Sequence, residues 1–309
     1  MILCLGTTPA VQRVMVFPKL ALDAVNRAAK VLDGAAGKSI NAAKVLDTLG
    51  EHPVATGFLG GDRGEFLRAT LEARGIESEF VPIAARTRQC VTVIDEGGGT
   101  VTELVEESSR GDAADFEKLV EIVQRRAPSC RALVMSGTIA PGGPVDLYFV
   151  CTRLANEAGA ISVVDAQGAA LIEALKAGPG LVKPNRAELA ATVGRDLPNE
   201  PAVMLAMREL RERGAQRVIV TAGRDPALAF DGQRFWRVTP PKIVPMNPIG
   251  SGDAFTAGLV ARLVHGDALD EACRWAGAAG AANALTLLAG EVDRTDVERL
   301  VGEVTVERI

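Results

Sequence analysis

The sequence predicts an α/β protein built around a mostly parallel central sheet, with a smaller sheet beside it. Uninterrupted apolar runs of strand length alternate with amphipathic stretches of helical length over most of the 309 residues. Continuous apolar strands are buried on both faces, which is typical of a parallel sheet covered by helices. Two segments break this alternation, and they predict the smaller sheet. With 48% hydrophobic and 24% charged residues, the chain has enough apolar surface for a packed core.

The elements of the main sheet follow from the apolar runs and the helical periodicity between them. The predicted strands are Ile2–Gly6, Val54–Leu59, Ala132–Ser136, Ile161–Asp165, Leu181–Lys183 and Val218–Thr221. The predicted helices are Asn41–Leu49, Gly64–Arg74, Phe116–Arg126, Val145–Ala158 and Ala202–Arg213. Beyond Gly252, small and apolar residues predict an almost wholly helical end of the chain. Ligands bind at the carboxyl ends of the strands in such a sheet, so the loops after the strands are the place to look for a site.

The two interruptions predict a small antiparallel sheet outside the main one. Gln12–Phe17 and Ala28–Leu32 alternate polar and apolar residues with no helix between them. Gln89–Asp95 and Thr100–Val105 are β-rich and flank a glycine-rich turn, which is a hairpin signal. We expect these segments to form a lid over an active site; the alternative is an ordinary pair of surface hairpins. The predicted core is residues 1–10, 34–85 and 111–309, and the predicted lid is residues 11–33 and 86–110.

Composition argues against several classes of function. The net charge is −5, no basic run is present, and the chain has only nine Phe, two Trp and one Tyr. Nucleic-acid binding generally needs a basic face and stacking platforms, so we expect no such partner. No apolar stretch is long enough to predict a membrane span, and the first residues lack the basic region of a signal peptide. We therefore expect a cytoplasmic protein with no membrane partner.

Cysteine and histidine are too scattered for a metal centre or a disulfide framework. The five cysteines are far apart in the sequence, no C-x-x-C occurs, and only His52 and His265 are present. We favour the interpretation that the cysteines are reduced core residues of a cytosolic protein. A Ser/His/Asp hydrolase is also disfavoured, because neither histidine lies beside a G-x-S-x-G turn.

The stretch NPIGSGDAFTAG, which begins at Asn247, carries the clearest chemical signal. Gly250 and Gly252 allow a sharp turn and a close approach of backbone to ligand. The predicted helix that follows leaves its first amides unpaired and places positive charge at the turn, so we expect an anion hole formed by Gly250, Ser251 and Gly252. The same field favours the ionised form of Asp253. A carboxylate base beside an anion hole suits phosphoryl transfer to an alcohol; the alternative is an acid that merely begins a helix.

A second glycine turn, residues 34–39, predicts another anion site. It is not a Walker motif, because Leu32 stands where that pattern needs glycine. Lys38 follows Gly37 directly and can meet an anion as a point charge, while Asn41 can bond hydroxyl groups. Arg88, at the entry to the hairpin, can clamp a phosphate with its planar guanidinium. Two anion sites suit a nucleotide phosphate and a phosphorylated substrate.

These motifs together resemble the ribokinase-like (PfkB) carbohydrate kinases. NPIGSGDAFTAG looks like the signature near the C-terminus of that family, and Leu181–Leu189 (LVKPNRAEL) is similar to its Lys-Pro-Asn-x-x-Glu segment. Residues 36–41 (AGKSIN) resemble the Gly-Gly-Lys-Gly-x-Asn of the phosphosugar branch, which includes 1-phosphofructokinase and tagatose-6-phosphate kinase. Further matching segments follow in the expected order over nearly the whole chain. The resemblance implies a ribokinase-like three-layer fold with a mostly parallel central sheet and a small β-sheet lid.

The resemblance also implies an ATP- and Mg²⁺-dependent phosphotransferase with assigned residues. Asp253 would be the general base, beside the anion hole of Gly250, Ser251 and Gly252. The remaining implied roles are nucleotide contacts by Lys183, Asn185, Thr221, Gly223 and Asn283, organisation of Mg²⁺ by Asn185 and Glu188, and acceptor contacts by Gln12, Gly37, Lys38, Asn41 and Arg88. The family's lid is often used in dimerisation, so a homodimer through the lid is expected.

Three positions depart from the family pattern. The phosphosugar branch usually has an aspartate where this chain has Gln12, which both donates and accepts and so favours a different hydroxyl pattern. Ser39 replaces a glycine beside Lys38, and Pro226 removes an N–H near the expected nucleotide. The residues expected to carry out catalysis therefore match the family pattern, whereas some of those expected to bind the sugar differ from it. The alternatives are a kinase for an unphosphorylated sugar or nucleoside, and a non-catalytic regulator that binds a sugar phosphate.

Overall fold

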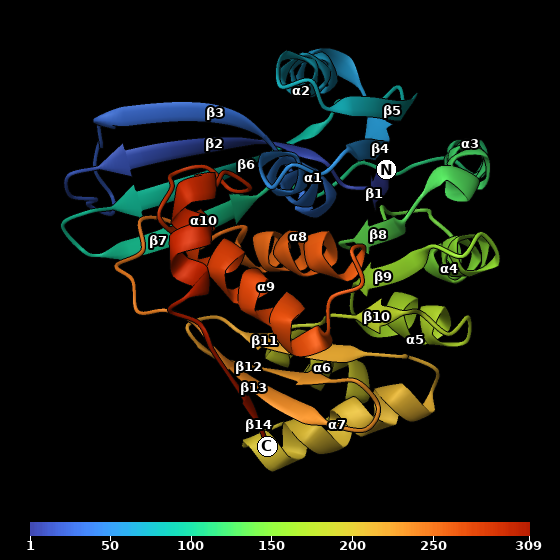
Figure 1. Cartoon of the computed structure of the whole chain (residues 1–309). Helices are drawn as coiled ribbons and strands as arrows, with labels where there is room; N and C mark the ends of the chain where they lie inside the picture. Colours follow the sequence, from blue (N-terminus) through green and yellow to red (C-terminus); the bar gives the residue numbers. More distant parts are fainter.

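The computed structural model describes all 309 residues and places them around one ten-stranded sheet (Figure 1). The strand order is β14-β13-β12-β11-β10-β9-β8-β1-β4-β5. The bounds are β1 (Ile2–Gly6), β4 (Pro53–Leu59), β5 (Glu77–Pro82), β8 (Ala132–Ser136), β9 (Ile161–Asp165), β10 (Leu181–Val182), β11 (Val218–Ala222), β12 (Asp225–Phe230), β13 (Phe235–Thr239) and β14 (Thr305–Arg308). Neighbours from β11 to β5 pair in parallel, and β12, β13 and β14 extend the sheet antiparallel. The mostly parallel central sheet is therefore confirmed.

Helices cover both faces of this sheet, which gives three layers. One apolar core joins the sheet to α1 (Lys38–Thr48), α2 (Gly61–Ala73), α8 (Ser251–Leu263), α9 (Leu269–Ala284) and α10 (Arg294–Val301). The other joins it to α3 (Ala113–Arg126), α4 (Leu147–Glu157), α5 (Gly168–Leu175), α6 (Arg186–Val193) and α7 (Glu200–Glu212). The alternation within β1 shows why. Ile2 and Cys4 belong to the first core, and Leu3 and Leu5 to the second, because successive side chains of a strand point to opposite faces.

A four-stranded second sheet projects from one side of the main body (Figure 1). Its order is β3-β2-β6-β7, with bounds β2 (Ala10–Phe17), β3 (Lys30–Ala36), β6 (Arg88–Asp95) and β7 (Thr100–Val105). The expectation of a purely antiparallel sheet was wrong, because the central pair β2 and β6 runs parallel. The two excursions leave the core in the same direction, so their first strands lie side by side, and each then turns back in an antiparallel hairpin.

The sequence patterns missed several elements. β5, β12, β13, α5 and α6 were not predicted, and the chain after Gly252 is not wholly helical, since β14 adds a strand at the edge of the sheet. All five cysteines are buried and free. None of the helices combines the length and the apolar character that crossing a membrane requires.

Candidate active site

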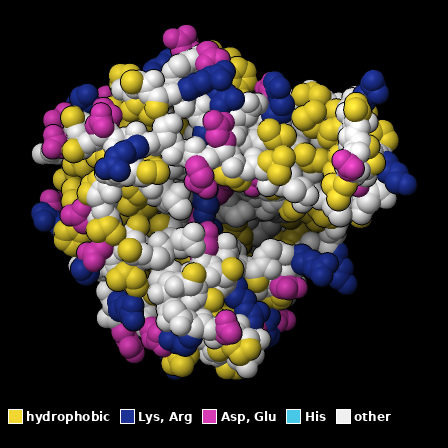
Figure 2. All heavy atoms as spheres, turned by 180° about the vertical axis from the view of Figure 1, so that it is seen from behind, with side chains coloured by type: hydrophobic (Ala, Val, Ile, Leu, Met, Phe, Trp, Pro, Cys, Tyr) yellow, Lys and Arg dark blue, Asp and Glu magenta, His cyan; other side chains and the backbone are white.

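A cavity of about 400 Å³ lies between the main body and the small sheet, where the surface is visibly hollowed (Figure 2). Residues from loops after the main-sheet strands, from the first turns of α1 and α8, and from the small sheet face it. They are Ala10, Gln12, Ala36, Gly37, Lys38, Asn41, Arg88, Cys90, Glu103, Val105, Asp165, Lys183, Asn185, Glu188, Thr221, Ile249, Gly250, Gly252, Asp253 and Ala289. The structure therefore brings most of the sequence-predicted site residues to one place, at the carboxyl ends of the strands.

The glycine corner before α8 has a geometry that requires glycine. Gly250 has φ 86°, and a Cβ there would lie 2.7 Å from the Cβ of Ala289. The amides of Gly250 and Gly252 bond no acceptor in the protein, and both residues line the cavity. The amide of Ser251, by contrast, donates to the Pro248 carbonyl at 3.2 Å, and Ser251 does not line the cavity. Two amides rather than three are thus free to meet an anion.

Asp253 lies on the first turn of α8, faces the cavity and is 8% exposed. Its Oδ2 accepts a hydrogen bond from Asn41 Nδ2 at 2.7 Å. Burial raises the pKa of Asp253 to about 6, although Lys38 and the Asn41 amide oppose the rise. The field of the helix end favours the ionised form, as the sequence argument has it, but the loss of solvent outweighs it and the net pKa is raised. At pH 7 the carboxylate still exceeds the acid form about tenfold.

Asp165, which was not among the predicted site residues, is the centre of an ionic cluster. Its carboxylate is 1% exposed and lies 2.9 Å from Lys183 Nζ and 3.3 Å from Lys38 Nζ. Thr256 Oγ1 donates to the same carboxylate at 3.1 Å. Burial alone would raise the pKa of Asp165, but the two ammonium groups outweigh it and hold that pKa below its usual value. An aspartate at the end of a buried strand was the available signal, and its partners became visible only in the fold.

Lys38 and Arg88 both line the cavity, but their surroundings differ. Lys38 Nζ bonds Asp165 and also Glu188 Oε1 at 3.1 Å, and the Asp165 charge is the main cause that raises the pKa of Lys38. Arg88 bonds only backbone carbonyls, those of Thr8 and Glu106. The Arg88 guanidinium therefore has no carboxylate partner, whereas the charge of Lys38 is shared between two carboxylates.

Asn185 and Glu188 begin α6 with a reciprocal capping box. Asn185 Oδ1 accepts from the Glu188 amide at 2.9 Å, and Glu188 Oε2 accepts from the Asn185 amide at 2.8 Å. The structure contains no group of three or more His, Cys, Asp or Glu arranged to hold a metal ion. A cation that needs a full set of protein ligands does not fit here. Mg²⁺ does, because it commonly takes one or two carboxylates and fills its remaining positions with water and substrate phosphate.

The other sequence-predicted residues fall into two groups. Lys183 and Thr221 line the cavity, whereas Gly223 and Asn283 do not. Asn283 is fully buried, donates to the Ile249 carbonyl at 2.9 Å and accepts from the Gly290 amide at 2.7 Å. It therefore supports the glycine corner from behind.

Gln12 and Asn41 differ in how far their amides are satisfied by the protein. Gln12 donates to Thr92 Oγ1 at 3.0 Å and accepts from the Ala289 amide at 3.0 Å. The Oδ1 atom of Asn41 is buried and has no hydrogen-bond partner. A buried acceptor without a donor is unfavourable, so a hydroxyl group of a ligand would fit at Asn41.

Comparison with known proteins gives a consistent result along the chain. A family model described as pfkB family carbohydrate kinase matches residues 1–295. A putative phosphofructokinase from Staphylococcus aureus is 29% identical, with 100% of this chain and 99% of that chain covered and a TM-score of 0.82. Phosphofructokinase-2 from Escherichia coli, in complex with potassium, is 28% identical, with 97% of each chain covered and a TM-score of 0.88. A possible 1-phosphofructokinase from Thermotoga maritima is 25% identical, covers 100% of this chain and 99% of that chain, and has a TM-score of 0.92.

Proposed function

Because the chain belongs to the pfkB family of carbohydrate kinases, we propose that it transfers the terminal phosphoryl group of ATP to a hydroxyl of a sugar phosphate. Family membership makes the protein a sugar kinase and therefore a phosphotransferase, as the sequence motifs predict. One observation supports the proposed transfer to a sugar hydroxyl most directly. The buried Asp253 carboxylate lies beside the amides of Gly250 and Gly252, which bond no acceptor in the protein.

In the proposed reaction Asp253 acts as the general base. The carboxylate accepts the proton of the acceptor hydroxyl while the hydroxyl oxygen forms a bond to phosphorus. The bond between that phosphorus and the bridging oxygen breaks, and ADP leaves with the electron pair. The amides of Gly250 and Gly252 donate to the oxygens that carry the negative charge during transfer. Lys183, at the edge of the same cavity, adds positive charge.

The acceptor phosphate is proposed to bind at Arg88 and Lys38. Arg88 is the stronger candidate of the two, because binding through Lys38 must compete with Asp165 and Glu188. The unpartnered Asn41 Oδ1 supports a hydroxyl contact next to Asp253, since the two side chains already share a hydrogen bond. Gln12 and Gly37 would complete the wall of the acceptor site. The similar proteins named above are phosphofructokinases, which agrees with a phosphorylated acceptor.

The nucleotide is proposed to lie along Lys183, Asn185, Thr221 and Gly223, with Asn283 holding the corner rather than touching the base. Glu188 and Asn185 would hold Mg²⁺ through water or phosphate oxygens. When bound, Mg²⁺ neutralises part of the charge of the ATP phosphates. We also propose that two copies associate through the small sheet, which we call the lid.

A substrate panel tests the proposed function directly. ADP release is measured with free and phosphorylated sugars, and the product is identified by mass. We expect turnover with a sugar phosphate, and we expect Asp253→Asn to lower kcat by about 10²-fold or more while nucleotide binding is kept. Unchanged turnover in this variant would remove the role given to Asp253. If the wild type releases no ADP with any sugar of the panel, a non-catalytic regulator is favoured.

A second pair of variants tests the acceptor phosphate. Arg88→Ala and Lys38→Ala should raise KM for a sugar phosphate much more than KM for the matching free sugar, because only the first carries the anion. Equal effects on both acceptors would favour a kinase for an unphosphorylated sugar or nucleoside. The comparison within one variant also serves as the control for general damage to the cavity.

A further inference from the structure

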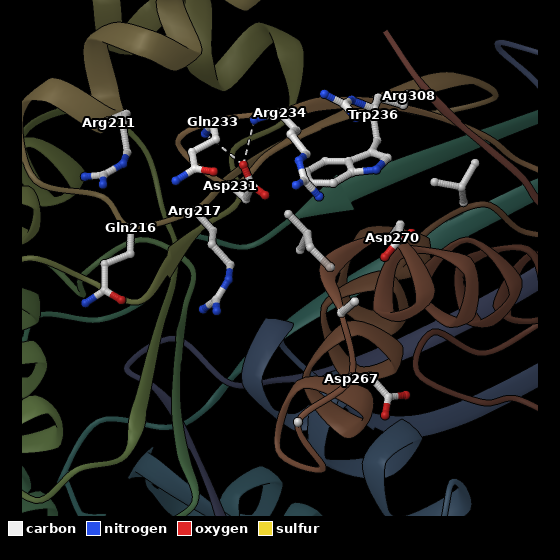
Figure 3. Close-up of a pocket in the computed structure, with 14 residues that line it drawn as sticks. Arg211, Gln216, Arg217, Asp231, Gln233, Arg234, Trp236, Asp267, Asp270 and Arg308 are labelled. Atoms are coloured by element: carbon white, nitrogen blue, oxygen red, sulfur yellow. Dashed lines mark hydrogen bonds between the residues drawn. The ribbon is translucent and has the colours of Figure 1, made fainter.

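A second hollow, of about 970 Å³, lies at the opposite end of the main sheet from the active-site cavity. β11 begins beside it, just after Arg217, and reaches the active-site cavity at Thr221, its last residue but one. Arginine side chains from four separate segments surround this hollow: Arg211, Arg217, Arg234 and Arg308 (Figure 3). We call it the arginine basin. Nothing in the kinase reaction uses it.

The four arginines of the basin form no ion pair and no side-chain hydrogen bond within the protein. Arg195, Arg237 and Arg262, on nearby elements, each bond a carboxylate at 2.5 to 2.7 Å. Arg211, Arg234 and Arg308 are exposed and Arg217 is half-buried, so solvent screens their mutual repulsion, and an anion bound between them would lower it further.

The acidic residues of the basin do not satisfy these arginines. Asp267 pairs with Arg262, outside the basin lining. Asp231 accepts hydrogen bonds from the backbone amides of Gln233 and Arg234 at 2.8 and 2.7 Å (Figure 3). Asp270, on the first turn of α9, bonds no cation. Two carboxylates of the basin, those of Asp231 and Asp270, are therefore without an ion pair. Since the basin has four guanidinium groups, its net charge is positive.

The backbone beneath Arg211 helps to set its position. Gly232 has φ 95°, and a Cβ there would lie 2.6 Å from Arg211 Nε, so the guanidinium group rests against the bare backbone of the β12–β13 turn. The guanidinium groups present planar donor pairs, which match the oxygens of phosphate groups better than a lysine does. A molecule with several phosphate groups offers oxygens to more of these donor pairs than a single phosphate does.

From these observations we propose that the arginine basin binds a small metabolite that carries two or more phosphate groups, at a site separate from the kinase active site. A nucleoside polyphosphate and a sugar bisphosphate share this chemistry. The proposal does not depend on which sugar the active site phosphorylates.

Calorimetric titration of the full chain tests the proposal, with inorganic tripolyphosphate as the probe. The active site can also take this probe, so the wild type should show two classes of site. Arg217→Ala with Arg234→Ala should keep one class and weaken the other at least about tenfold, since each lost charge-assisted contact contributes about 1.5 kcal/mol or more. Arg211→Ala with Arg308→Ala should cause the same selective loss. Arg68→Ala, an exposed arginine on α2 without an ion pair, is the matched control and should change nothing.

Kinase turnover reports whether each variant is folded, because none of these arginines lines the active-site cavity. Orthophosphate should bind the basin at least about tenfold more weakly than tripolyphosphate, since it spans fewer arginines. Parallel titrations with a nucleoside triphosphate and a hexose bisphosphate then identify the source of the phosphate groups. The proposal is overturned if both double variants, still active as kinases, bind tripolyphosphate as the wild type does, or if orthophosphate binds equally well.

Discussion

At the scale of single residues, the properties of Asp253 come from a competition between burial and charge. The start of α8 and the nearby Lys38 both favour the carboxylate, while the loss of solvent favours the acid. The result, a pKa raised to about 6, leaves a carboxylate that is ionised at pH 7 yet basic enough to accept a proton. A general base is most effective when its pKa lies close to the working pH, so the burial of Asp253 suits the role of base that we propose for it.

The pH dependence of kcat/KM should report this ionisation. The proposed base must be deprotonated, so we expect kcat/KM to fall about tenfold per pH unit below about pH 6. The phosphate of the acceptor also titrates near pH 6, so steady-state kinetics on the wild type alone cannot separate the two groups. The residual activity of Asp253→Asn supplies the control. In this variant the fall of kcat/KM below about pH 6 that is due to Asp253 should be absent. If both proteins show the same fall, it comes from the phosphate of the substrate.

The same raised pKa has a consequence for stability. At low pH Asp253 is protonated in both the folded and the unfolded chain and costs nothing. As the pH rises from the ordinary pKa of 3.8 to the folded pKa of about 6, the carboxyl ionises in the unfolded chain but not in the fold, so the protein loses stability over this range and stays at the lower level above it. The shift from 3.8 to about 6 corresponds to roughly 3 kcal/mol. Asp253→Asn should therefore raise the free energy of unfolding at pH 7.5 by up to about 3 kcal/mol, and by much less at pH 4.5.

Urea unfolding at the two pH values measures this effect. Asp196→Asn, a change at an exposed aspartate, is the control and should leave the free energy of unfolding unchanged at both. A gain for Asp253→Asn that is equal at pH 7.5 and pH 4.5 would show that the ionised carboxylate is not its cause.

The sequence could predict those site residues whose reason is local. The glycines at 250 and 252 are required by the backbone of their own turn, and Asp253 follows them directly. Asp165 could not be predicted in the same way. Its partner Lys38 lies 127 residues away, and their contact exists only because α1 begins where β9 ends. The position of Asn283 outside the cavity likewise could not be predicted. It depends on the loop around Gly290, whose amide bonds the Asn283 side chain.

At the scale of elements, the strands of the main sheet that were predicted are those buried on both faces. β1, β4, β8 and β9 read as uninterrupted apolar runs because helices cover them on either side. β14 has only one partly buried residue, Val306, so its sequence carries little apolar pattern. It forms a strand because it pairs with β13, so tertiary contact rather than local preference determines its structure.

The parallel pairing of β2 with β6 shows the same limit for a whole sheet. The strands of both hairpins were visible in the sequence from their alternating residues, and a glycine-rich turn marked the second hairpin. The way in which two hairpins meet depends on where each leaves the core, and that is a property of the topology. The strands could be predicted, whereas the partner of each first strand could not.

At the scale of the whole molecule, the active site is closed from two sides by different sheets. The core supplies Asp253, Asp165 and Lys183, and the lid supplies Arg88 and Glu103. Burial raises the pKa of Glu103, and the charge of Arg88 opposes the rise. The proposed acceptor site therefore depends on the position of the lid relative to the core, and anything that fixes the lid also fixes Arg88.

The proposed homodimer would fix the lid in this way. The lid carries exposed apolar side chains on both edge strands, Val31 on β3 at 49% and Leu104 on β7 at 56%, and hydrophobic residues gather on this part of the surface (Figure 2). Exposed edge strands of this kind pair readily with another chain, and large exposed apolar patches mark interaction sites. A second copy would cover the patch.

We therefore expect the wild type to sediment at twice the 32.4 kDa mass of the chain and Leu104→Lys to shift it toward the monomer. A lysine at the edge leaves an unpaired charge in the contact, which is costly there and harmless in solvent. Leu205→Lys, at a leucine of the same 56% exposure on α7, is the matched control and should leave the mass unchanged. Because the proposed dimer would hold the lid, Leu104→Lys should also raise KM for the sugar phosphate, while KM for ATP changes little. A wild type that sediments as a monomer, or a dimer that survives Leu104→Lys and Val31→Lys together, would contradict association through the lid.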